Sequence, residues 1–234
     1  FPEPTVPTAI ALTTLNEFAL VTVWDTKALK GQLAVVALEG KFLSYHTWPH
    51  MGFPNQGSWS AFKILGYVDL PMAAPSSVSA ASNGWWESPG TTGGLALSQI
   101  DLNDDSRRKL LWDGNWQGVI ATKGYAIVAS KQENKVCFVD LTPLFAYMKQ
   151  SYLSSVAAFQ ASCAARGPKD TDFPRAFSAL PSIKPSVVYS TTVARPTAVL
   201  AGIKLNRWTQ DRHKAYVASE DGTITIFDAS SLKK

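Results

Sequence analysis

Residues 125–140 read YAIVASKQENKVCFVD, two runs of β-branched and aromatic residues joined by a short polar turn. Two such runs predict a β-hairpin. The pattern returns at residues 215–228, which read AYVASEDGTITIFD, and it occurs earlier at residues 18–38, which read FALVTVWDTKALKGQLAVVAL. Repetition of one hairpin at long spacing predicts a repeat architecture built from antiparallel strands.

Each hairpin belongs to a longer unit. Proline opens a strand upstream, at residues 7–10, 75–80 and 196–199. Fourth strands are expected at residues 62–69 and 187–193. A weaker copy follows Pro75, and its later strands are expected at residues 95–100 and 109–112. We therefore expect about four antiparallel units, at residues 5–40, 62–112, 116–193 and 196–228.

The spacing of the repeats points to a propeller. Val136 and Ile224 are 88 residues apart, and without the 44-residue segment 143–186, which differs in character, the spacing is 44. A four-stranded propeller blade takes ~40 to 50 residues. The proline-led first strand, the Tyr-Val-Ala-Ser type of second strand and the third strand ending in Asp resemble the WD40-like and YVTN-like β-propeller superfamily. That resemblance implies an all-β fold of about four β-propeller blades, part of a larger ring, although the Trp-Asp pairs of WD40 repeats are not regularly present.

Composition favours one folded domain over residues 1–234, with a helical insertion at 143–186. Hydrophobic residues make up 46% of the chain and charged residues 17%, which suits a sizeable core. The net charge of +4 is small and scattered, so nucleic acid is not an expected partner. No apolar run reaches the ~20 residues of a membrane helix. The low charge and the many Ser, Thr, Gly and Trp residues favour an extracytoplasmic protein, secreted or periplasmic, and a start without Met suggests a processed product or a fragment.

The two ends of the chain leave no room for a full fourth strand. Only residues 1–6 precede the first proline-led strand, and only residues 229–234 follow the last hairpin. Because an open propeller exposes strand edges and apolar faces, we expect an additional chain or missing blades to complete the ring. The alternative is a four-bladed ring that residues 1–6 close.

One amphipathic helix is expected within the insertion. Thr142 is a suitable N-cap, Pro143 suits the first helical position, and Gly167-Pro168 ends the pattern. Apolar residues follow at spacings of three and four, namely Leu144, Phe145, Met148, Tyr152, Val156, Phe159 and Cys163. We expect this helix, residues 143–166, to pack on its own domain, with docking to a partner as the alternative.

Two further insertions carry aromatic residues suited to contact with a ligand or partner. They contain the candidate contact residues His46, Trp48, His50, Trp59, Trp85 and Trp86. Pro49 separates the two histidines and excludes the helical spacing of a metal motif, so no metal is expected. Paired tryptophans on a Gly-rich loop stack on sugar rings or fill protein pockets, so a glycan is a possible ligand.

The remaining candidate ligand groups favour structural roles. Residues 103–106, Asn-Asp-Asp-Ser, lack the alternating ligands of a calcium loop and suit a turn. Cys137 lies in an apolar strand and Cys163 on the helix stripe, so each is interpreted as a small buried residue, with a disulfide between them as the alternative.

Catalytic signatures are missing from the sequence. It contains no nucleophile elbow, no Walker loop and no dinucleotide fingerprint, so no cofactor is expected. The favoured hypothesis is a non-catalytic propeller that serves as a protein-binding or structural module in a larger complex. The alternatives are a propeller enzyme with a site in the central channel, lactonase-like or quinoprotein-like, and a glycan-binding module that uses exposed tryptophans.

Overall fold

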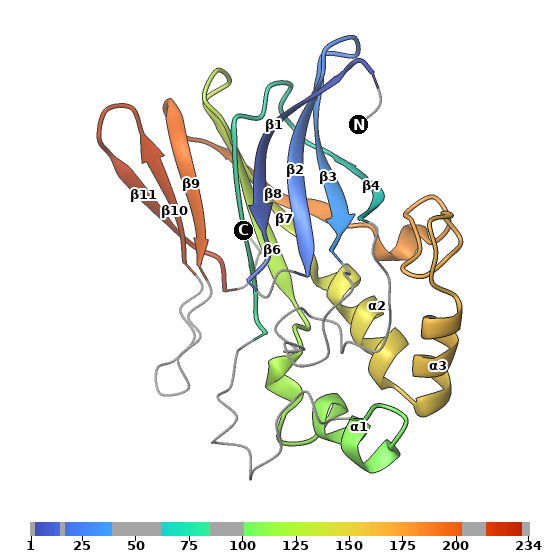
Figure 1. Ribbon diagram of the computed structural model, residues 1–234. Coiled ribbons are helices and arrows are strands. Elements are labelled where there is room, and N and C mark those ends of the chain that lie inside the picture. The colour runs from blue at the N-terminus through green and yellow to red at the C-terminus, as the bar shows by residue number, and fades with distance from the viewer. Residues whose placement is uncertain (1–2, 15–16, 39–61, 85–100, 203–213, 231–234) are drawn as a thin grey trace.

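Figure 1 shows the computed structural model of the chain, which describes residues 3–14, 17–38, 62–84, 101–202 and 214–230. This part of the chain is mostly β, with three antiparallel sheets of four, four and three strands. The helices gather at one end of the sheets, at the bottom of the view. Each sheet pairs strands that follow one another in sequence, so the chain forms three successive meanders.

The first sheet has the strand order β1-β2-β3-β4. Its strands are β1 (Thr5–Leu12), β2 (Phe18–Asp25), β3 (Lys30–Ala37) and β4 (Lys63–Asp69). The turn between β2 and β3 begins at Asp25, whose carboxylate accepts hydrogen bonds from the amides of Lys27 and Ala28 at 3.0 and 2.7 Å. This side-chain bonding is typical of Asp in turns and fixes the register of the hairpin.

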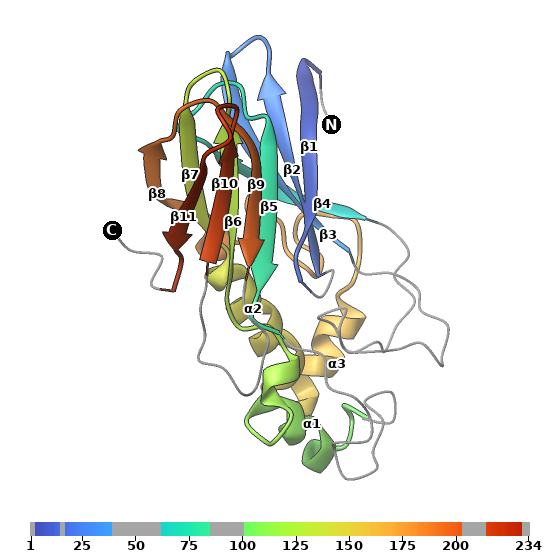
Figure 2. The same cartoon turned by 90° about the vertical axis from the view of Figure 1, so that its left-hand side faces the viewer.

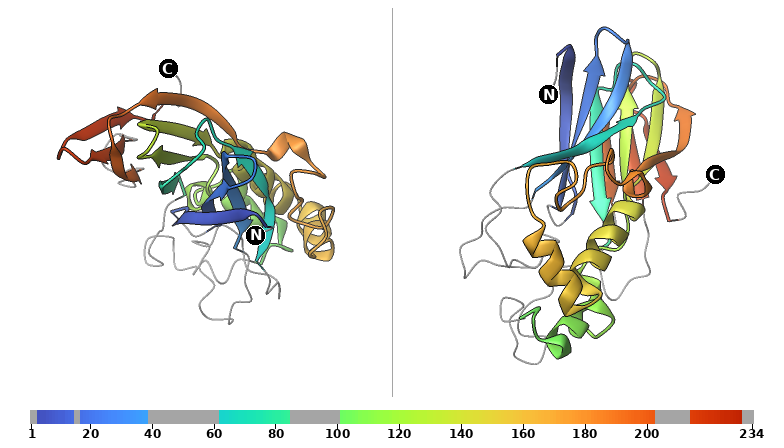
Figure 3. Two further views of the ribbon diagram at one scale, coloured as in Figure 1. Left: turned by 90° about the horizontal axis from the view of Figure 1, so that it is seen from above. Right: turned by 90° about the vertical axis from the view of Figure 1, so that its right-hand side faces the viewer.

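The second and third sheets repeat this plan. The second contains β5 (Ser77–Ser82), β6 (Gly124–Ser130), β7 (Lys135–Asp140) and β8 (Ser186–Thr192). The third contains β9 (Pro196–Gly202), β10 (Lys214–Ser219) and β11 (Ile224–Asp228). Seen from above, the three sheets fan out from one another, with the second in the middle (Figure 3). The predicted hairpins and the fourth strands β4 and β8 are confirmed.

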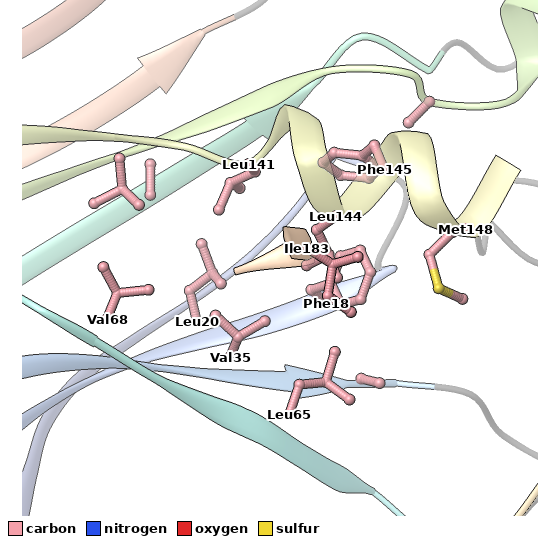
Figure 4. Packing of buried hydrophobic residues seen from close by; sticks show 14 of the residues in the cluster. Phe18, Leu20, Val35, Leu65, Val68, Leu141, Leu144, Phe145, Met148 and Ile183 are labelled. Atoms are coloured by element: carbon pink, nitrogen blue, oxygen red, sulfur yellow. The ribbon is translucent and has the colours of Figure 1, made fainter. Parts of the chain in front are cut away.

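The main core lies between the first two sheets and continues onto the helices. In β2, Phe18 and Leu20 face the second sheet and are fully buried. Phe18 contacts the helix residue Phe145 edge to face, with ring centroids 5.4 Å apart, and Figure 4 shows this packing. Alternate residues of β2 point the other way and form a second cluster with β3, so both faces of this sheet are apolar.

The helical insertion contains two helices where the sequence predicted one. These are α2 (Thr142–Leu153) and α3 (Val156–Ala164), and Leu141 rather than Thr142 is the N-cap of α2. The break arises because the Ser155 hydroxyl accepts a hydrogen bond from the amide of Ala158 at 3.0 Å and so caps a new helix. The expected packing on the chain's own sheets is confirmed, since the predicted stripe is buried at Leu144, Phe145, Met148, Tyr152 and Phe159.

The expected number of units requires a correction. Residues 109–112, predicted as a strand, belong to the helix α1 (Asp105–Trp112), while residues 95–100 lie outside the described residues. Asp104 caps α1 by accepting from the amide of Ser106, and Asp105 pairs with Arg108 and Lys109 one turn later. These helix-favouring contacts outweigh the apolar run. The proline-led strand β5 therefore joins β6, β7 and β8, and the described residues form three sheets rather than four.

The described strands do not close a ring. β1 pairs with β2 and β11 pairs with β10, and these outermost pairs lie at opposite ends of the fan. Thr5 and Val6 lie opposite Asp25 and Trp24 of β2. The alternative in which residues 1–6 close a four-bladed ring beside β11 is therefore wrong for residues 3–6. In the described part of the chain, no helix combines the length and hydropathy needed to cross a membrane.

Candidate functional site

One face of the third sheet exposes a row of apolar side chains. Leu200, Tyr216 and Ile226 lie side by side on the three strands, and they are 59%, 36% and 58% exposed. Ile224 lies further along β11 and is 63% exposed. Figure 2 looks onto this sheet, with the second sheet behind it. We call these four residues the outer face of the third sheet.

The opposite face is fixed against the second sheet, which leaves the outer face turned away from the core. Ala201, Ala215 and Val217 are buried in the cluster that also holds Ile127 and Phe138. Phe227 packs edge to face on Phe138, with ring centroids 5.4 Å apart. Because side chains alternate along a strand, burial of this face sets the direction of the residues between.

Polar contacts fix the same interface at its centre. The hydroxyl of Tyr125 accepts a hydrogen bond from the amide of Gly202 at 3.1 Å and lies 3.1 Å from the carbonyl oxygen of Lys214. Burial raises the pKa of Tyr125 to about 12, so the hydroxyl stays protonated and able to donate. The hydroxyl of Ser79 accepts from the amide of Ala201 at 2.9 Å. The third sheet is thus held in one position on the second.

A hollow of about 330 Å³ opens beside this interface, between the end of β8 and the β10–β11 hairpin. Its lining is rich in hydroxyl groups and contains one aromatic ring; the lining residues are Thr191, Thr192, Val193, Ala194, Ser219, Asp221, Thr223, Thr225 and Phe227. We call it the β8–β11 hollow. Its walls suit side chains of small or medium size that are apolar or bear a hydroxyl.

Charged groups lie at the ends of the third sheet. At one end Lys214 pairs with Asp228 at 3.5 Å, and hydrogen bonds from Ser230 hold the pKa of Asp228 at about 2. At the other end Glu220 pairs with Arg195 and, at 3.5 Å, with Lys131. The row of apolar residues between them is uncharged, so apolar contact is the chemistry this face offers.

A second apolar surface lies at the other end of the fan. Ile10 and Leu12 of β1 lie opposite Val21 and Ala19, on the face of the first sheet that points away from the second. They are 66% and 47% exposed. The first and third sheets thus both expose apolar side chains on the face that points away from the second sheet.

All six residues predicted as contacts lie outside the described residues; they are His46, Trp48, His50, Trp59, Trp85 and Trp86. Cys137 is buried and Cys163 half-buried, and no disulfide joins them, so the alternative of a disulfide is wrong. Within the described ranges, no group of three or more His, Cys, Asp or Glu side chains could hold a metal ion. Residues 103–106, for which the sequence predicts a turn rather than a calcium loop, form a turn and the start of α1.

The sequence of β11 contains a signal for an apolar outer face. Ile224 and Ile226 alternate with Thr225 and Phe227, so β11 carries large side chains on both faces. A strand with two apolar faces indicates a layer on each side. Comparison of the chain with family models, curated proteins and solved structures gives no match.

Proposed function

We propose that the chain is a non-catalytic module of β-propeller blades that binds further protein through the outer face of its third sheet. The observation that carries this proposal is the exposure of Leu200, Tyr216, Ile224 and Ile226 together on one sheet face. Contiguous exposed apolar residues mark sites of protein contact. In the chain's own interfaces, similar rows are buried by the neighbouring sheet.

The order of the strands supports the propeller part of the proposal. Each sheet is a meander, and the first strands β1, β5 and β9 neighbour one another, while the fourth strands β4 and β8 also make contact. Propeller blades have this plan, with first strands around an axis and fourth strands at the rim. In such a ring each outer blade face is covered by the next blade, which accounts for the apolar faces at both ends of the fan.

Self-association of the purified chain tests the proposal. With the outer face uncovered, the chain should associate at micromolar concentration, and sedimentation velocity measures this directly. Removing one buried Leu or Ile side chain from an interface costs roughly 1.5 to 3 kcal/mol, or about tenfold or more in affinity. Leu200→Ser and Ile226→Ser should therefore each raise the dissociation constant by about tenfold or more.

A matched control is available in the β2–β3 turn. Leu29 is 65% exposed and lies outside both apolar faces, so Leu29→Ser should leave association unchanged. If Leu29→Ser weakens association as much as Ile226→Ser does, the outer face has no special role. A wild-type chain that stays monomeric at all concentrations would count against the proposal.

A further inference from the structure

β11 forms the edge of the third sheet among the described residues. The first and second sheets each have a fourth strand, β4 and β8, beyond the third. In the third sheet β11 occupies the third position and pairs with β10 on one side. Its other side faces β8, as Figure 2 shows, and the β8–β11 hollow lies there.

The register identifies which backbone groups point to this free edge. The amide of Ser219 donates to the carbonyl oxygen of Thr223 at 2.9 Å, which makes these two residues a hydrogen-bonded pair. Bonded and non-bonded pairs alternate along an antiparallel ladder. The backbone groups of Thr223, Thr225 and Phe227 therefore bond to β10. The amide and carbonyl groups of Ile224 and Ile226 point away from β10, to the open side of β11.

The hollow continues an interface already present in the molecule. Between the first and second sheets, the fourth strands β4 and β8 contact each other and fill the rim of the core. Between the second and third sheets, β8 is present, but the described part of the third sheet has no fourth strand to contact it. Thr191 on β8 and Thr225 on β11 line the hollow at this position. The volume of about 330 Å³ exceeds the ~150 Å³ in which a protein cavity binds benzene, so it has room for roughly two medium side chains.

We propose that β11 binds an extended segment of a partner polypeptide, antiparallel to β11, with alternate side chains seated in the β8–β11 hollow. The backbone of Ile224 and Ile226 supplies the ladder hydrogen bonds, as in other cases of strand addition to a sheet edge. Side chains that enter the hollow are β-branched or small, since hydroxyl groups, one phenyl ring and the Asp221 side chain line it. The inference rests on the proposed protein-binding role of the third sheet, but concerns the edge of the sheet rather than its outer face.

The chain supplies a suitable probe peptide. β7 holds the third position in the second sheet, as β11 does in the third, and its partner β8 is the strand that follows it. A synthetic peptide of residues 185–193, PSVVYSTTV, thus has the composition that the edge should accept. The same peptide with Pro in place of Tyr189, at its centre, is the control that cannot form a continuous ladder, because the amide of Tyr189 faces the third strand in the second sheet.

Amide hydrogen exchange, measured by NMR on the full chain, reports the pairing residue by residue. Saturating probe peptide should slow exchange at Ile224 and Ile226 by about tenfold or more, because their amides become ladder donors. Exchange at Thr225 and Phe227, which already bond to β10, should change less. The control peptide should have no effect.

Variants separate the edge from the face. Ile226→Pro removes the outward amide and leaves the bonds to β10 in place, so it should abolish peptide binding. Ile226→Thr keeps the amide and should still bind the peptide, although it weakens self-association through the outer face. Thr191→Tyr, on β8, fills the hollow from the opposite wall and should weaken peptide binding about tenfold without altering β11.

Three results would overturn the inference. The first is unchanged exchange at Ile224 and Ile226 with millimolar probe peptide. The second is a reversed pattern in the variants, in which Ile226→Pro still binds the peptide and Ile226→Thr no longer does. That pattern would assign peptide binding to the outer face and leave the proposed function intact. The third is protection of these amides that grows with protein concentration in the absence of peptide, which would make a second copy of this chain the occupant.

Discussion

Replacing Tyr125 by Phe tests how the third sheet is held on the second. The change removes one hydroxyl and keeps the ring in its place between the sheets. In the structure that hydroxyl accepts from the amide of Gly202 and lies within hydrogen-bond distance of the carbonyl oxygens of Gly202 and Lys214. Tyr125 is 2% exposed, so water does not readily replace these bonds.

The expected loss of stability follows from these contacts. Leaving a buried donor or acceptor without its partner costs about 1 to 3 kcal/mol. We therefore expect Tyr125→Phe to lower the free energy of unfolding by about 2 kcal/mol. For a chain of this size, that corresponds to a fall in Tm of roughly 4 to 8 °C, measurable by calorimetry. Hydrogen exchange in β9 and β10 should accelerate more than exchange in the first sheet.

The pH dependence of stability gives an independent readout of the same hydroxyl. Burial raises the pKa of Tyr125 to about 12 in the folded chain, against an ordinary value near 10. Above pH 10 the unfolded chain loses this proton while the folded chain keeps it, so the contribution of Tyr125 is present below pH 10 and is lost between pH 10 and 12. Over that range the stability of wild type should fall more steeply than that of Tyr125→Phe.

A matched control uses the tyrosine on the other face of the same sheet. Tyr216 is 36% exposed, and Tyr216→Phe should leave Tm nearly unchanged. Equal Tm values for wild type and Tyr125→Phe, or equal losses in the two variants, would refute the account of how the third sheet is fastened.

Two further predictions concern the helical end and the thiols. Phe159 is 3% exposed and packs near the Tyr152 ring, so Phe159→Asp should lower the free energy of unfolding by about 2 to 4 kcal/mol in urea titrations; an unchanged midpoint would show that α3 does not pack as described. Cys137 is fully buried and its pKa is raised to about 12 by burial, whereas Cys163 is half-buried, so a thiol reagent should modify Cys163 first and Cys137 only after unfolding. Equal rates at both thiols in the native chain would contradict this placement of β7.

The strands were predictable from sequence because their signals are local. The run at residues 125–140 combines β-branched residues with a polar turn, and it folds as β6 and β7. The misassigned run at 109–112 is also apolar, yet the cap at Asp104 and the charge pairs of Asp105 make it helical. Capping by Ser155 likewise divides a helix whose apolar spacing is continuous. In both cases polar side chains at the start of a helix outweigh a hydrophobic pattern.

The sequence indicates two apolar faces for β11, but it does not reveal which face of the third sheet is exposed. Leu200 and Ile224 have the character of core residues, and a strand pattern does not reveal which of its two faces has a covering layer. That information lies in the sheet order and in the register that aligns Leu200 with Tyr216 and Ile226. The β8–β11 hollow depends on two strands from different sheets, which no local pattern brings together.

Hydroxyl-radical footprinting tests the central claim most directly, because it measures the accessibility of each outer-face side chain. The isolated chain and the protein in its native preparation are labelled under identical conditions and compared by mass spectrometry. We expect oxidation of Leu200, Tyr216 and Ile226 to fall several-fold in the native preparation, while oxidation of Leu29 stays constant. Equal labelling of the outer face in both samples would contradict the claim that this sheet face binds further protein.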